Sequence, residues 1–272
     1  MTGRTPGPPP DDGVRALRLV VLGESTAFTD EHGPQLPDAP HLYPNVTARL
    51  LAERLGREVE VATIGRAAMT ADQAWDLVTR DRHAMFEVLA GCDAVVVGVG
   101  SFDHAPGGWP APLTDLAGHL RPPALRRRVK RGLHTTYPWV VRATAWRTWR
   151  TPRSVFTDRF DKVLLQVRGL AFGAAGVVLG PTSHRSAYYA HRHPQRVAGE
   201  ALHLSIARAH GFATVPAWEL VEPHADALNP DGIHWPAPAH VAVAEALAAA
   251  LAPQLTGHAP RPPRPGVDEP IG

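Results

Sequence analysis

The sequence predicts a three-layer α/β/α fold with a five-stranded parallel sheet, and two observations support this prediction. Five short segments are rich in Val, Leu, Ile and Ala, and several of them end at a glycine. Such runs are typical of strands that are buried on both faces of a parallel sheet. The segments between them carry apolar residues at helical spacing, as the crossover connections of parallel strands require.

The first predicted strand, 19–22, ends at Gly23 and is the most continuously apolar. The second alternates between apolar and polar residues until Gly65, and the third is the apolar segment DAVVVGVG. In chain order, the five predicted strands are 19–22, 59–64, 93–100, 176–180 and 212–215.

The first crossover helix is predicted after the first strand. Val46, Leu50 and Leu55 recur at helical spacing, Pro44 suits a first helical turn, and Gly56 suits a helix end. The same kind of spacing predicts helical turns over 71–79 and 83–89, and helices over 155–172, 197–210 and 238–251.

The length of 272 residues and the mass of 29.3 kDa suit one large α/β domain. A hydrophobic fraction of 44% with 20% charged residues is ordinary for a soluble globular enzyme. The two ends are rich in Pro and Gly and lack apolar periodicity, so we expect both to be disordered. The predicted organisation is a tail over 1–13, a single catalytic domain over 14–256 and a second tail over 257–272.

Cys92 is the only cysteine, which excludes an intrachain disulfide. No metal site is expected, because the run His191-Arg192-His193 has no further ligand in fixed register. The sequence shows no signal peptide and no apolar run near the ~18 residues of a membrane span. We therefore expect a cytoplasmic protein without stable membrane insertion.

The regular alternation breaks at Ser101 and resumes near Val155, which predicts an insertion over about 104–154 after the third strand. It holds four of the seven tryptophans: Trp109, Trp139, Trp146 and Trp149. The segment 139–150 is predicted to form an amphipathic helix that caps the site. The alternative is a surface helix docked by its tryptophans.

Although the net charge is only +2, the basic residues are concentrated in this insertion. Between Asp115 and Asp158 there is no acidic residue, so this segment favours an anion; the alternative is a solvated basic face. A nucleic acid is not expected, because no readout motif accompanies the charge. The basic residues are Arg121, Arg126, Arg127, Arg128, Lys130, Arg131, Arg142, Arg147, Arg150 and Arg153.

Ser25 follows the first predicted strand at its carboxyl end, and the carboxyl ends of the strands are where open α/β sheets bind ligands. A serine hydroxyl attacks only when a base removes its proton, and a carboxylate must orient that base. Asp231 and His234 lie three residues apart on one predicted loop and can supply both groups. The order Ser, Asp, His is also used by unrelated hydrolases.

Four blocks follow the ends of predicted strands: Gly23-Glu24-Ser25, Gly65, Gly100-Ser101-Phe102-Asp103, and Asp231 with His234. Over roughly residues 17–252, the chain thereby resembles the SGNH or GDSL hydrolase superfamily, whose fold is flavodoxin-like. The resemblance implies that Ser25 is the nucleophile, Asp231 the orienting group and His234 the base. It also implies that the backbones of Ser25 and Gly65 form the oxyanion hole. Phe102 stands where the family has an asparagine donor, and losing one such donor typically costs ~10²–10³ in rate. The nearest substitutes are Ser101 and His104.

A closer resemblance is to the diglucosylglycerate octanoyltransferases. It rests on YPN at 43–45, Asp103, the basic run RPPALRRRVKRG at 121–132 and DGIHW at 231–235. It implies transfer of an octanoyl group from acyl-CoA, a co-substrate and not a cofactor, to a glucosylated glycerate during methylglucose lipopolysaccharide biosynthesis. These enzymes also lack the usual asparagine. The residues expected to bind the substrates are Asn45, Phe102, Asp103, Trp139, Trp146, Trp149 and Trp235.

Two other functions remain open from the sequence. The first is an esterase or thioesterase that uses the same residues with water as acceptor, since the two reactions diverge only after the acyl-enzyme forms. The second is a binding protein that keeps the fold but lost the chemistry at Phe102. The sequence indicates neither the acyl-chain length, nor the acceptor hydroxyl, nor the oligomeric state.

Overall fold

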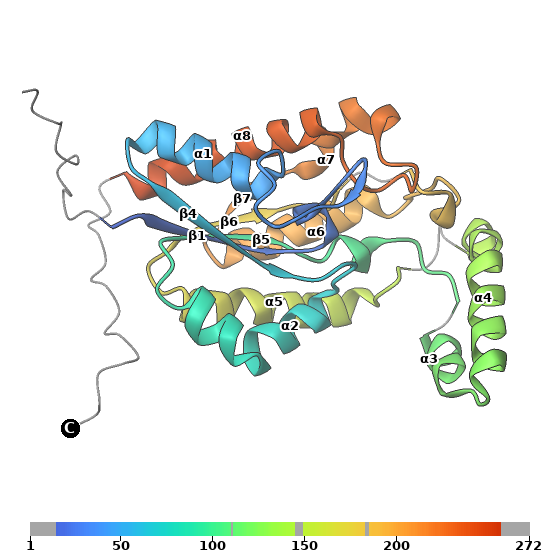
Figure 1. The fold of residues 1–272 in the computed structure, drawn as a ribbon. Coiled ribbons are helices and arrows are strands. Elements are labelled where there is room, and N and C mark those ends of the chain that lie inside the picture. The colour runs from blue at the N-terminus through green and yellow to red at the C-terminus, as the bar shows by residue number, and fades with distance from the viewer. Residues whose placement is uncertain (1–14, 110, 145–148, 183–184, 257–272) are drawn as a thin grey trace, which may run out of the picture.

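A computed structural model describes residues 15–109, 111–144, 149–182 and 185–256 (Figure 1). The predicted tails at 1–13 and 257–272 lie outside the described residues, as does Trp146. None of the described helices combines the length and apolarity that a membrane crossing requires.

The centre of the protein is a five-stranded parallel sheet with the strand order β4-β1-β5-β6-β7. The strands are β1 (Leu17–Gly23), β4 (Val59–Gly65), β5 (Ala94–Gly98), β6 (Ala175–Leu179) and β7 (Ala213–Val215). A short antiparallel pair, β2 (Thr29–Asp30) and β3 (Gly33–Pro34), follows β1.

Helices cover both faces of the sheet (Figure 1). Leu19 and Val21 of β1 point into one core with α1 (Tyr43–Leu55), α7 (Ala217–Val221) and α8 (Ala237–Leu255). Val20 and Leu22 point into the opposite core with α2 (Ala71–Arg80), α5 (Arg153–Leu170) and α6 (Arg196–Ala209). Because successive side chains of a strand face opposite sides, one apolar run serves both cores. The structure therefore confirms the predicted three-layer α/β/α fold.

Short helical turns lie at the loops: η1 (Ser25–Ala27), η2 (His83–Leu89), η3 (Ser101–His104), η4 (Ala187–Tyr189) and η5 (Glu222–Ala227). Three of them follow the ends of β1, β5 and β6. The turn η2, a π-helix of seven residues, coincides with the helical turns predicted over 83–89. The sequence did not predict the 3₁₀ turns η1, η3, η4 and η5 or the helix α7, because elements of three to six residues carry too few apolar positions to show a period.

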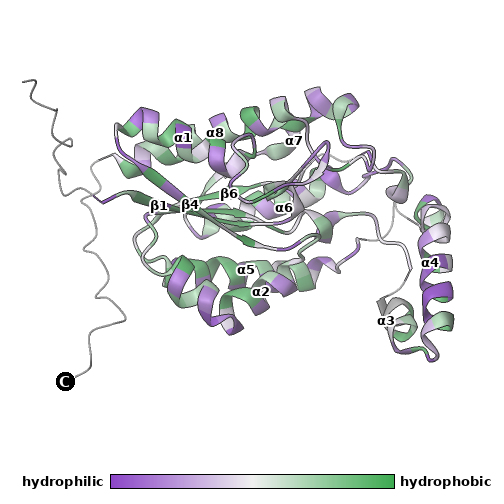
Figure 2. Cartoon of the chain, viewed as in Figure 1, coloured by the Kyte–Doolittle hydropathy of each residue, from purple (hydrophilic) through white to green (hydrophobic). Residues whose placement is uncertain are grey.

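The insertion forms a hairpin of α3 (Ala111–His119) and α4 (Pro123–Thr144), which stands beyond the carboxyl ends of the strands (Figure 1). Tyr137 and Val141 of α4 are buried in a small cluster with Ala105, Tyr189 and Ala190. Most of the helix beyond this contact is exposed and hydrophilic (Figure 2).

The predicted helix over 139–150 is wrong at both ends. The helix begins at Pro123, and it ends at Thr144, whose hydroxyl donates to Val140 O (2.8 Å) and Gly107 O (3.3 Å). Trp149 lies beyond it and pairs with Pro106 in a β-bridge. The basic first half was missed because it projects from the body and needs no apolar face.

Candidate active site

Ser25 lies directly after β1, at the first position of the 3₁₀ turn η1, and is 5% exposed. The turn is tight, since a Cβ on Gly23 would lie 2.7 Å from Cβ of Ala27. Glycine at position 23 therefore allows the chain to leave the sheet abruptly and places the serine at the strand end.

Gly65 ends the neighbouring strand β4 and is the register partner of Gly23. Its φ is +147°, and a Cβ there would lie 1.8 Å from the Gly23 carbonyl oxygen. Only glycine fits this close approach. The Gly65 backbone is thus held beside the turn that carries Ser25.

Asp231 and His234 are hydrogen-bonded within one loop, with 2.5 Å between Asp231 Oδ2 and His234 Nδ1. Asp231 Oδ1 also accepts the backbone N–H groups of Ile233 (2.8 Å) and His234 (3.2 Å). The carboxylate therefore shapes the turn and orients the imidazole at the same time. The other ring nitrogen, His234 Nε2, is buried and has no hydrogen-bond partner among the described residues.

The histidine loop is attached to the segment that follows Ser25. Trp235 forms a parallel β-bridge with Asp30, and the Asn229 side chain donates to Asp30 O at 3.1 Å. Within the described ranges, Ser25 and His234 share no direct hydrogen bond. Such bonds are often longer without substrate and tighten when it binds. The structure thus brings the two segments of the expected triad together.

The third block begins at Gly100, where φ is +102°, and continues into η3. Ser101 and Phe102 line a narrow, mainly apolar pocket of about 10 Å³ together with Ile233, the residue before His234. His104 is instead buried, with its Nε2 3.2 Å from His203 Nδ1. Of the two candidates for the missing donor, only Ser101 faces this pocket.

Glu24 is a residue of this region that the sequence analysis did not identify. Both of its carboxylate oxygens are buried and make no hydrogen bond of standard geometry within the described part of the chain. Burial raises the pKa of Glu24 to about 8; nearby Ser101 lowers it and the Asp103 carboxylate raises it further. The only signal in the sequence was an acidic residue between an apolar strand and a serine.

Three residues expected to bind substrate are structural. Asp103 is completely buried, and its carboxylate accepts the Ala71 N–H at the start of α2 (2.8 Å); burial raises its pKa to about 6. Trp235 is also 0% exposed, packed between the rings of Tyr43 and His240. The Asn45 side chain donates to the carbonyls of residues 37 and 39. Asp103 and Trp235 therefore have no exposed surface for a ligand, whereas Asn45 is half-buried and its amide N–H groups bind the protein's own backbone.

The tryptophans of the insertion are separated from one another. Trp139 is 70% exposed on α4, where Arg142 lies 5.5 Å from its ring centre. The Trp149 ring packs edge-on against His104, with 5.0 Å between the ring centres. The predicted cap of tryptophans over Ser25 is therefore not formed by these two residues, since one faces solvent and the other faces a buried histidine.

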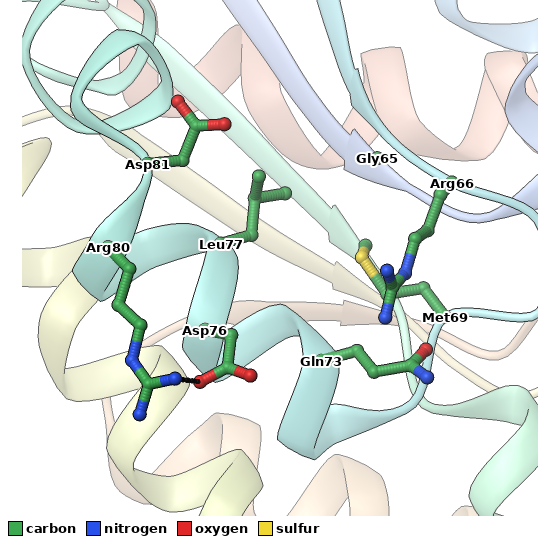
Figure 3. A pocket seen from close by; sticks show the side chains of 8 residues that line it. All are labelled: Gly65, Arg66, Met69, Gln73, Asp76, Leu77, Arg80 and Asp81. Atoms are coloured by element: carbon green, nitrogen blue, oxygen red, sulfur yellow. Dashed lines mark ion pairs between the residues drawn. The ribbon is translucent and has the colours of Figure 1, made fainter. Parts of the chain in front are cut away.

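A larger pocket of about 360 Å³ lies beside Gly65, along α2 (Figure 3). Its lining includes the polar side chains of Arg66, Gln73 and Asp76 and the apolar side chains of Met69 and Leu77. No group of three or more His, Cys, Asp or Glu side chains in the described part of the chain is arranged to hold a metal ion.

Known structures with the same fold are lipases and acylhydrolases. The chain is similar to a lipase/acylhydrolase from Enterococcus faecalis, with a TM-score of 0.56, 13% identity and coverage of 91% of this chain and 100% of that chain. For a putative GDSL-like lipase from Parabacteroides merdae, the TM-score is 0.57, the identity 12% and the coverage 89% and 97%. At these identities, the likeness establishes the SGNH/GDSL fold alone.

Sequence relatives are more specific, although no protein-family model matches the chain. Two diglucosylglycerate octanoyltransferases, from Mycolicibacterium hassiacum and Mycobacterium tuberculosis, are 31% and 28% identical to it. The alignments cover 88% of this chain in both cases, and 96% and 93% of the two relatives. The chain therefore belongs to the family of diglucosylglycerate octanoyltransferases, acyltransferases with the SGNH/GDSL hydrolase fold.

Proposed function

We propose that the protein transfers an octanoyl group from acyl-CoA to a sugar hydroxyl of diglucosylglycerate, through an acyl-serine intermediate, in methylglucose lipopolysaccharide biosynthesis. The observation that carries the proposal is the His234 imidazole. It is oriented by Asp231, its Nε2 is buried and unpaired within the described residues, and its loop is bridged to the segment after Ser25. This is the arrangement that a general base for a serine nucleophile requires.

In the first half-reaction, His234 Nε2 takes the Ser25 hydroxyl proton while Ser25 Oγ attacks the thioester carbonyl carbon. The backbones of Ser25 and Gly65 and the Ser101 hydroxyl donate to the oxyanion, with Ser101 in place of the missing asparagine. The tetrahedral intermediate then collapses with cleavage of the C–S bond. His234 returns the proton to the leaving thiolate of CoA.

In the second half-reaction, His234 removes a proton from a sugar hydroxyl of the acceptor. The alkoxide attacks the acyl-serine carbonyl, the ester bond to Ser25 breaks, and the proton returns to Ser25 Oγ. Water in place of the sugar would give free octanoate, the reaction of a thioesterase. Beside Ser101, the side chains of Phe102, Ala105 and Ile233 offer apolar surface to the start of an acyl chain, but their pocket of about 10 Å³ is too small for the whole chain.

Intact-mass analysis after incubation with octanoyl-CoA tests the first half-reaction. We expect one acyl adduct on the wild type, none on Ser25→Ala and none on His234→Ala. The matched control is Ser205→Ala, on the exposed side of α6, which should acylate like the wild type. An undiminished adduct on Ser25→Ala, or no adduct on the wild type, would refute the mechanism.

A competition assay tests the second half-reaction. With diglucosylglycerate present, we expect octanoylated acceptor to exceed free octanoate. If free octanoate dominates at every acceptor concentration, the protein is a thioesterase. Restoring asparagine by Phe102→Asn provides a further check, since it should accelerate an active enzyme that lacks one oxyanion donor and leave an inert binding protein inert.

A further inference from the structure

The pocket of about 360 Å³ along α2 is not used by the triad or by the narrow apolar pocket. It lies between the end of β4 and the outer side of α2 (Figure 3). Its volume is within the range of small-molecule sites in proteins. The lining residues are Gly65, Arg66, Met69, Gln73, Asp76, Leu77, Arg80 and Asp81.

Arg66 is the cation of this pocket that is available to a ligand. It is exposed, follows Gly65 directly, and makes no ion pair or hydrogen bond within the described residues. Arg80, in contrast, is paired with Asp76 at 3.2 Å (Figure 3). A guanidinium without a partner in a pocket is suited to bind a carboxylate in a bidentate manner.

The remaining polar groups are held in place by the protein itself. Gln73 Oε1 accepts the backbone N–H of Thr70 (3.2 Å), which leaves the amide Nε2 as a donor. Asp81 Oδ1 accepts the Ala84 N–H (3.0 Å), which leaves the other carboxylate oxygen for a ligand. Fixed amide and carboxylate groups are the usual partners of sugar hydroxyls, and Met69 and Leu77 offer apolar surface to a sugar ring.

The side chains that line the pocket favour one of the two proposed substrates, the glycosylated acceptor, over the other, acyl-CoA. Besides Arg66 and Arg80, the lining carries two carboxylates, Asp76 and Asp81, which disfavour the multiply charged phosphates of CoA more than a ligand with a single carboxylate. A ligand with many hydroxyls and one carboxylate matches each of these groups. The pocket therefore fits the acceptor better than the donor.

The position of the pocket connects it to the nucleophile. Gly65, at one end, is the register partner of Gly23, two residues before Ser25. Asp81, at the other end, follows the last residue of α2, which spans ten residues or about 15 Å. An elongated ligand along this helix, with its carboxylate on Arg66, would thus place the sugar that is attached to the hydroxy acid nearest the acyl-serine.

We propose that this pocket is the acceptor subsite, where Arg66 binds the carboxylate of a glycosylated hydroxy acid and Gln73, Asp76 and Asp81 bind its sugar hydroxyls. The inference rests on the proposed function for the identity of the acceptor. It adds the residues that recognise the acceptor and the class of compound they select.

Isothermal titration without any acyl donor tests the subsite independently of catalysis. The ligands are diglucosylglycerate and the matching diglucosylglycerol, which lacks the carboxylate. The wild type should prefer the acid by at least about tenfold. Arg66→Met should bind the acid about tenfold more weakly and lose this preference, and the exposed Arg82→Met, outside the pocket, should behave like the wild type.

A second variant separates the sugar contacts from the carboxylate contact. Asp76→Asn should weaken both ligands by a similar factor and keep the preference for the acid. The subsite is overturned if the wild type binds neither ligand, if Arg66→Met binds the acid normally, or if it weakens both ligands equally. It is also overturned if Arg66→Met slows formation of acyl-serine by the factor by which it weakens binding.

The titration and the acyl-adduct assay together separate failure of the acceptor subsite from failure of the proposed function. Arg66-dependent binding of the acid with no adduct on Ser25 would support the subsite and refute the acyl-serine mechanism. An adduct on Ser25 with acceptor binding that does not depend on Arg66 would support the mechanism and refute the subsite.

Discussion

At the scale of single residues, the proposed chemistry depends on one short contact between the side chains of Asp231 and His234. Asp231 Oδ2 and His234 Nδ1 are 2.5 Å apart, within a turn that Asp231 itself stabilises. A carboxylate in this position selects the tautomer with the proton on Nδ1 and stabilises the imidazolium that forms during attack. The contact is local, so the spacing of three residues was sufficient to predict it.

Asp231→Asn should lower the rate of acyl-serine formation by about 10³–10⁴, because an amide cannot stabilise the imidazolium and can favour the wrong tautomer. Single-turnover kinetics with octanoyl-CoA measures this rate. Asp226→Asn, at a fully exposed position of η5, is the control and should keep the wild-type rate. A wild-type rate in Asp231→Asn would exclude the assigned role.

Glu24→Gln should change the pH dependence of stability. The pKa of Glu24 in the folded protein is about 8, above the ordinary value of 4.5, so the folded state holds a proton that the unfolded state has lost. The contribution of Glu24 to the stability of the wild type should therefore fall as the pH rises from 4.5 to 8, and this loss should be complete above 8. Glutamine resembles the protonated acid and removes this loss, which amounts to about 4–5 kcal/mol.

Urea unfolding at pH 5, 7 and 9 measures this effect. The free energies of unfolding of wild type and Glu24→Gln should nearly coincide at pH 5 and diverge in favour of the variant at pH 9. Glu53→Gln, on the exposed side of α1, should follow the wild type at each pH. A constant difference between Glu24→Gln and wild type across this range would show that Glu24 is ionised in the folded protein.

At the scale of elements, the backbones at the carboxyl ends of β1 and β4 approach each other more closely than a side chain on residue 65 would permit. The backbone of Gly65 touches the carbonyl of Gly23, its partner in the register. This contact ties the strand that carries Ser25 to the strand that ends at the proposed acceptor pocket. Stability and activity therefore depend on the same glycine.

Gly65→Ala should destabilise the protein by at least about 2 kcal/mol, because φ is +147° and the new Cβ would lie 1.8 Å from a backbone oxygen. Acyl-serine formation should fall as well, since the clash displaces the turn that holds Ser25. Gly132→Ala, on α4 with no atom near the new Cβ, should be neutral or stabilising by up to about 1 kcal/mol. Urea unfolding of both variants gives the comparison, and equal free energies would contradict the close approach.

Elements were predictable from the sequence where local patterns are strong. The apolar runs of β1 and β5 and the helical spacing of α1, α5 and α8 led to the observed elements, with ends displaced by a few residues. The first half of α4 was missed, because an exposed basic helix has no apolar stripe to reveal it. The strand order was not predicted, since it depends on pairing between distant segments.

At the scale of the whole molecule, buried histidines connect segments that are far apart in the chain. His104 of η3 contacts His203 of α6 at 3.2 Å, and His240 of α8 accepts the Tyr43 N–H of α1 (3.2 Å). Burial lowers the pKa of His203 to about 3 and that of His240 to about 4, and it lowers the pKa of His104 below its ordinary value. The folded protein therefore keeps these rings neutral.

Acid should destabilise the whole fold for this reason. The folded pKa values lie below the ordinary value of 6.5, so the unfolded chain binds protons that the folded chain does not. The stability is fully present above pH 6.5 and is lost progressively as the pH falls toward 3. Thermal unfolding of Glu24→Gln, which lacks the opposite pH dependence of Glu24, should show between pH 8 and 4 a melting temperature that declines below about pH 6.5.

Two variants test the assignment of this acid sensitivity. His203→Phe should be less stable at pH 7.5, because it removes the partner of His104, but its melting temperature should decline less on acidification. His32→Gln, at a position whose side chain is 80% exposed, should follow the wild-type profile. A decline as steep in His203→Phe as in the wild type would exclude His203 from this effect.

The sequence by itself determined the class of fold, the segments that form the sheet, the family and the pairing of Asp231 with His234. Each of these follows from local signals: apolar runs, glycines at strand ends, and two side chains within one turn. Only the tertiary structure decided that Glu24 and Asp103 are buried carboxyl groups, that Trp235 belongs to the core, and that a pocket with charged side chains in its lining opens beside Gly65. The physical reason is that burial and pocket shape depend on contacts between segments distant in the chain, and no local pattern of residues encodes those contacts.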